Sequence, residues 1–76
     1  MELFLDLEQE EDGRWIAEIS ELPGVLAYGA TPVHAGAKAK ALALRVLAER
    51  MEQESALPDI SGITFTARTH DHLAVR

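Results

Sequence analysis

A single long run of helix-forming residues divides this chain and limits the folds open to it. The run begins at Thr31 and Pro32, residue types that suit the N-cap and the first position of a helix. It continues to about Gln53 and is dominated by Ala, Leu, Arg, Lys and Glu, all of which favour helix. We therefore expect one helix in the 76 residues, with strands on both sides of it in the sequence.

Polar and apolar residues alternate in residues 2–8 and 14–19, and alternation is typical of half-buried strands. Residues 25–28 form a short apolar segment that suits a third strand. Asp12 and Gly13 suit a tight hairpin turn, because glycine adopts the positive φ angles that such turns need. Pro23 and Gly24 predict a second turn. Three antiparallel strands joined as a meander are expected, at residues 2–8, 14–19 and 25–28.

A fourth strand is expected after the helix, over residues 63–69, where Ile63, Phe65 and Ala67 alternate with polar residues. A crossover that contains a helix suits parallel pairing within one sheet. The sequence thus predicts an α+β fold of order βββαβ: a three-stranded antiparallel meander, a fourth strand, and one helix packed on the sheet. Residues 1–76 are expected to form a single domain, since a chain this short supports one small core.

The expected helix has two apolar sides, and one sheet cannot bury both of them. The larger side should cover the sheet and comprises Val33, Ala37, Ala41, Leu44, Leu47, Ala48 and Met51. The second side comprises Ala35, Ala39, Leu42 and Val46. Leu42 and Val46 are therefore expected at an interface with another chain, and a homodimer is expected. Pairing through an exposed strand edge is the other route open to such a dimer.

Acidic residues are concentrated in the first third of the chain. Residues 1–24 hold eight acidic side chains and one basic one, whereas residues 25–76 hold five acidic and six basic ones. Such a distribution repels phosphate backbones and attracts basic proteins, although solubility alone would also explain it. We expect no direct nucleic-acid ligand, and we expect Trp15 in the core rather than stacked on bases. The lack of cysteine, of a secretory signal and of a membrane-spanning run favours a cytoplasmic protein.

No group of residues predicts catalysis, so no catalytic, cofactor or metal site is expected. Asp6 and Glu8 share one side of the first strand and could begin a two-metal nuclease site, but residues 63–69 contain no acid to complete it. His70, Asp71 and His72 offer too few ligands for a firm metal site.

The order of turn and strand residues resembles the HicB family of small antitoxin domains. The resemblance covers about residues 2–52 and rests on the acidic-Gly hairpin, the strand that ends in Pro-Gly, the Tyr28-Gly29-Ala30-Thr31 step, and the alanine-rich helix after it. It implies a partial ribonuclease-H-like fold without the nuclease carboxylates. It also implies that the chain binds a HicA-type toxin, a small basic ribonuclease that cleaves messenger RNA, and neutralises it by protein–protein contact.

The resemblance also implies where the toxin would bind and where the chain departs from its relatives. The implied contacts are Glu10, Glu11, Asp12, Glu18 and Glu21. Val33 and His34 stand where many members have an acidic pair, and no C-terminal DNA-binding domain is expected before Arg76. Two alternatives stay open: a solitary homo-oligomeric interaction module without a toxin, and a relic metal-dependent nuclease.

Overall fold

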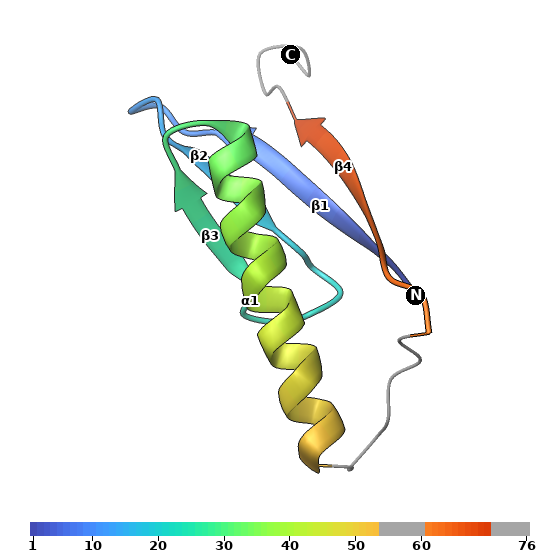
Figure 1. Ribbon diagram of the computed structural model, residues 1–76. Helices are drawn as coiled ribbons and strands as arrows, with labels where there is room; N and C mark the ends of the chain where they lie inside the picture. The colour runs from blue at the N-terminus through green and yellow to red at the C-terminus, as the bar shows by residue number, and fades with distance from the viewer. Residues whose placement is uncertain (54–60, 71–76) are drawn as a thin grey trace.

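The computed structural model describes residues 1–53 and 61–70, with the side chain of His70 excepted. One helix packs against a four-stranded mixed sheet, whose strand order is β3-β2-β1-β4 (Figure 1). β1 pairs antiparallel with β2, β2 pairs antiparallel with β3, and β4 pairs parallel with β1. The predicted α+β class and the βββαβ order are confirmed. The elements are β1 (Glu2–Gln9), β2 (Trp15–Glu18), β3 (Leu26–Gly29), α1 (Pro32–Gln53) and β4 (Thr64–His70).

The core lies between α1 and one side of the sheet. Successive strand residues point to opposite sides, so the three leucines of β1 all face the helix and are buried. Trp15 is half-buried and packs against this core, as expected. The buried hydrophobic residues of the described chain are Leu3, Leu5, Leu7, Ala17, Ile19, Leu22, Val25, Ala35, Ala39, Ala43 and Leu47.

Glycines shape both connections within the meander. Gly13 has a φ of 93° in the β1–β2 hairpin, and its N–H donates to the carbonyl of Glu10 at 2.9 Å. Gly24 has a φ of 85° between β2 and β3. Residues with a Cβ rarely adopt such angles, so both predicted turns are confirmed with the residue type they need.

The side of α1 that covers the sheet differs from the expected one. The helix packs through Ala35, Gly36, Ala39, Ala43 and Leu47, and only the last of these belongs to the side that was expected to do so. Small residues occupy the side of α1 that faces the sheet because they let the helix backbone approach it closely. A Cβ at Gly36 would lie 3.1 Å from a methyl group of Leu5. The larger apolar residues expected there are instead exposed, namely Val33 at 81%, Leu44 at 49% and Met51 at 36%.

Because a different side of α1 faces the sheet, the predicted role of Leu42 and Val46 also changes. Both side chains are half-buried and pack against the core of their own chain. Their assignment to an oligomer interface assumed that the sheet could not reach them, and that assumption is wrong. The apolar helix surface left uncovered in the described structure is the side that carries Val33 and Leu44.

Thr31 caps the start of α1. Its Oγ1 accepts a hydrogen bond from the N–H of His34 at 3.1 Å, and its carbonyl accepts one from the N–H of Ala35 at 3.0 Å. Thr31→Ala is expected to lower the free energy of unfolding by about 1 kcal/mol, because an N–H in the first turn loses its acceptor. Urea denaturation should show this loss, and Thr31→Ser should restore most of it. An alanine variant as stable as the parent would contradict the capping role.

Candidate functional site

The side of the sheet opposite α1 is not covered by any described element, and we refer to it as the open face. Strand alternation decides which residues lie on it. The register places Glu18 of β2 between Asp6 of β1 and Leu26 of β3. The open face is formed by Glu2, Phe4, Asp6, Glu8, Ile16, Glu18, Leu26, Tyr28, Thr64, Thr66 and Arg68, together with Arg14 beside the hairpin.

An apolar strip crosses the β2–β3 half of the open face. Ile16 is paired with Tyr28 in the register and lies next to Glu8 on its other side. Tyr28 is 38% exposed and Leu26 is 41% exposed. Large apolar side chains beside carboxylates form the kind of surface on which another protein can dock, because the apolar area supplies affinity and the charges supply selectivity.

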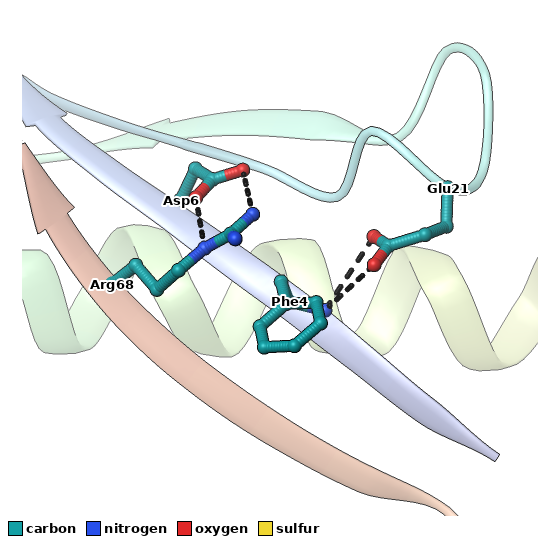
Figure 2. A network of polar contacts seen from close by, with 4 residues as sticks. All are labelled: Phe4, Asp6, Glu21 and Arg68. Atoms are coloured by element: carbon teal, nitrogen blue, oxygen red, sulfur yellow. Dashed lines mark hydrogen bonds and ion pairs between the residues drawn. The ribbon is translucent and has the colours of Figure 1, made fainter.

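The arginine of β4 is held by its own chain. The Nε of Arg68 donates to Oδ1 of Asp6 at 2.8 Å, and a terminal nitrogen donates to Oδ2 at 3.1 Å (Figure 2). The same guanidinium lies over the ring of Phe4, 4.2 Å from its centroid. This two-pronged pair and the ring contact fix the cation in place, so it contributes little free positive charge to the open face.

Arg14 is engaged in the same way at the hairpin. Its Nε lies 2.8 Å from Oδ2 of Asp12, and its guanidinium lies 4.6 Å from the centroid of the Tyr28 ring. The backbone N–H of Arg14 also donates to Asp12, and this bond holds the pKa of the Asp12 carboxyl below its usual value. Asp12 is therefore ionised, and its charge is largely matched by Arg14.

The structure divides the five candidate toxin contacts into separate places. Glu10, Glu11 and Asp12 lie together at the hairpin, in a shallow concavity of about 430 Å³ that Glu8 and Gln9 complete. Glu18 lies on the open face, beside the apolar strip. Glu21 lies in the connection after β2, where its carboxylate accepts the backbone N–H of Phe4 at 3.3 and 3.4 Å (Figure 2).

Three of these carboxylates are unengaged and two are engaged. The side chains of Glu10, Glu11 and Glu18 make no hydrogen bond or ion pair with another described residue. Asp12 binds Arg14, and Glu21 completes the hydrogen bonding of β1 beyond the end of β2. The unengaged three are therefore the better contacts for a cationic partner.

Asp6 and Glu8, from which a nuclease site could have begun, lie on the open face. Both oxygens of Asp6 accept hydrogen bonds from the guanidinium of Arg68, and this positive charge disfavours a metal cation at the same carboxylate. Within residues 1–53 and 61–70, no group of three or more His, Asp or Glu side chains could hold a metal ion. The side chains of His70, Asp71 and His72 lie outside the described residues.

Sequence reasoning did not identify the apolar strip of Ile16, Leu26 and Tyr28. Alternation placed Ile16 opposite the core side of its strand, but the sequence does not say whether a second layer covers that side. The signal that could have found the strip is that the sequence predicts a single helix, which can cover only one side of the sheet.

Comparisons with protein-family models, with curated proteins and with solved structures found no match for this chain. In the described part of the chain, α1 is too polar to cross a bilayer as a membrane-spanning helix.

Proposed function

We propose that this chain is a HicB-like antitoxin, which binds a HicA-type messenger-RNA-cleaving toxin and neutralises it by protein–protein contact. The observation that carries the proposal is the charge state of the open face and hairpin. The carboxylates of Glu10, Glu11 and Glu18 are unengaged there, whereas both arginines are matched by carboxylates of the same chain. Such a surface favours a cationic partner, and a ribonuclease that grips RNA has a cationic surface.

Inhibition would come from occlusion, with no bond-breaking step by this chain. Long-range attraction between the acidic hairpin and the toxin's cations would speed the encounter. The strip around Tyr28 would then supply short-range affinity, since partly exposed tyrosines are frequent anchors of protein interfaces. RNA would be displaced because its phosphates compete for the same cations.

Two further properties belong to the proposal. The chain acts as a homodimer, because its described part buries eleven hydrophobic residues, four of them alanines, and so small a core gives limited stability on its own. It works in the cytoplasm, where the messenger RNA that the toxin cleaves is found and where a chain without cysteine needs no disulfides.

The direct test is an RNA-cleavage assay in which this chain is mixed with a HicA-type toxin. Cleavage should fall as the chain is added and stop near stoichiometric amounts, and inhibition should weaken as salt rises, because screening reduces charge attraction. Undiminished cleavage with the chain in excess would contradict the proposal. The chain incubated alone with RNA and Mg²⁺ or Mn²⁺ should cleave nothing; cleavage that disappears in Asp6→Asn would support the nuclease alternative. Purification with no partner but itself would favour the solitary interaction module.

A further inference from the structure

A groove runs between α1 and β4 on the helix side of the sheet. α1 lies over β1, β2 and β3, whereas β4 is set beyond β1 and away from the helix (Figure 1). The groove has a volume of about 550 Å³. We call it the α1–β4 groove; it is lined by Leu5, Leu7, Pro32, Val33, Gly36, Ala37, Lys40, Ala41, Leu44 and Ala67.

The lining of this groove is apolar and incompletely covered. Ala67 pairs with Leu5 in the register and so faces the same side as the core, yet it is exposed. Among the described residues, Lys40 is the only charged one in the lining, and its ammonium group lies 5.8 Å from the centroid of the Phe65 ring. An apolar surface of this kind on a small chain indicates a place where another molecule packs.

The α1 wall of the groove, which we call the α1 ridge, also projects toward solvent. Val33, Ala37, Ala41 and Leu44 recur at helical spacing, and Val33 and Leu44 are 81% and 49% exposed. A two-fold dimer uses one patch on both copies, so the patch must complement itself. A ridge next to a groove meets this condition, because the ridge of each copy can enter the groove of the other.

Charge selects a second copy over a cationic protein as the occupant. The chain has a net charge of −6, and no carboxylate of residues 1–53 or 61–70 lines the groove. Glu8 and Glu18 lie on the opposite side of the sheet. Two copies that meet through their grooves keep these acids far apart. Contact through the open faces would instead bring the carboxylates of the two copies together, where they repel each other. A cationic partner is attracted to the acidic side instead.

We propose that the α1–β4 groove and the adjoining α1 ridge form the homodimer interface, with the ridge of each copy seated in the groove of its partner. This inference rests on the homodimer of the proposed function and not on toxin binding. The proposed interface replaces Leu42 and Val46, which are half-buried against the core of their own chain.

The test compares two variants that add one negative charge at exposed positions of α1. Leu44→Glu places the charge on the ridge, and His34→Glu places it outside the groove lining, in the first turn. Sedimentation across micromolar concentrations should give a dimer for the parent and for His34→Glu. The dissociation constant of Leu44→Glu should rise by at least about 100-fold, because the substitution is made on both copies.

A second measurement guards against a folding defect in Leu44→Glu, which circular dichroism would reveal. Lys38→Cys carries a spin label on one copy, and an isotope-labelled parent copy is observed by NMR. The spin label at Lys38→Cys of one copy should broaden the amide signals of Leu5 and Ala67 in the isotope-labelled copy. A spin label at Glu18→Cys of the first copy should leave those signals sharp. A monomeric parent, a folded Leu44→Glu that still dimerises, or absent broadening would overturn the proposal. The proposal would also be overturned if the parent were a monomer and Leu44→Glu abolished toxin binding. That result would mean that the toxin, and not a second copy, occupies the groove.

Discussion

Gly29→Ala is expected to lower the free energy of unfolding by about 3 kcal/mol or more, which is a large part of the total stability of a domain of this size. A Cβ on Gly29 would lie 2.5 Å from the backbone nitrogen of Ala35 and 2.9 Å from its Cα. These atoms belong to the first turn of α1, so relief requires the helix to move away from β3. Urea denaturation, followed by the fluorescence of Trp15, measures the loss.

The matched control for this substitution is Gly62→Ala. A Cβ there would meet nothing within 4 Å, so its effect should stay within about 0.5 kcal/mol. Equal stabilities for the two alanine variants would mean that α1 and β3 do not approach as closely as described. The contact also gives a physical reason for glycine after the aromatic residue in the step on which the HicB resemblance partly rests.

The second large effect is expected on toxin binding. The double substitution Glu10→Lys and Glu11→Lys should weaken inhibition of a HicA-type toxin by about 100-fold, because like charges across an interface cost several kcal/mol and each 1.4 kcal/mol is tenfold. The association rate should fall and its salt dependence should shrink. Titration of RNA cleavage and stopped-flow binding would measure the two effects. Folding should be unaffected, since neither side chain bonds to another described residue.

Glu49→Lys with Glu52→Lys provides the control, since it makes the same change of charge on exposed positions of α1. Inhibition by this variant should remain within a few-fold of the parent. Equal losses in the two double variants would show that net charge alone matters and would remove the hairpin from the contact surface. A loss only in the helix variant would place the toxin on the other side of the molecule.

Local signals explain why the sequence predicted the fold well. Alternation located β1, β2 and β4, and a short apolar segment located β3. Gly13 and Gly24 marked the turns, and Thr31 marked the helix start. Each of these signals depends on neighbours in the sequence. The parallel placement of β4 followed from the length of its crossover.

The buried side of α1 was not predictable in the same way, because it depends on how closely two backbones approach. Ala35 and Ala39 carry little hydrophobic area, yet they permit the close contact that Leu44 would prevent. The candidate site shows a similar limit. The sequence identified the acids, but not that Arg68, 62 residues further along, binds Asp6, or that Glu21 bonds to the backbone of Phe4.

The position of β1 in the sheet has a consequence for the order of folding. The β1–β2 hairpin joins near neighbours and can form early, whereas β4 must close a loop of some sixty residues before Leu3 meets Phe65. Until then, the leucine-rich strand β1 has one bare edge, which can pair with another chain. We expect the docking of β4 to be the late step, and a chain interrupted before it to aggregate during synthesis.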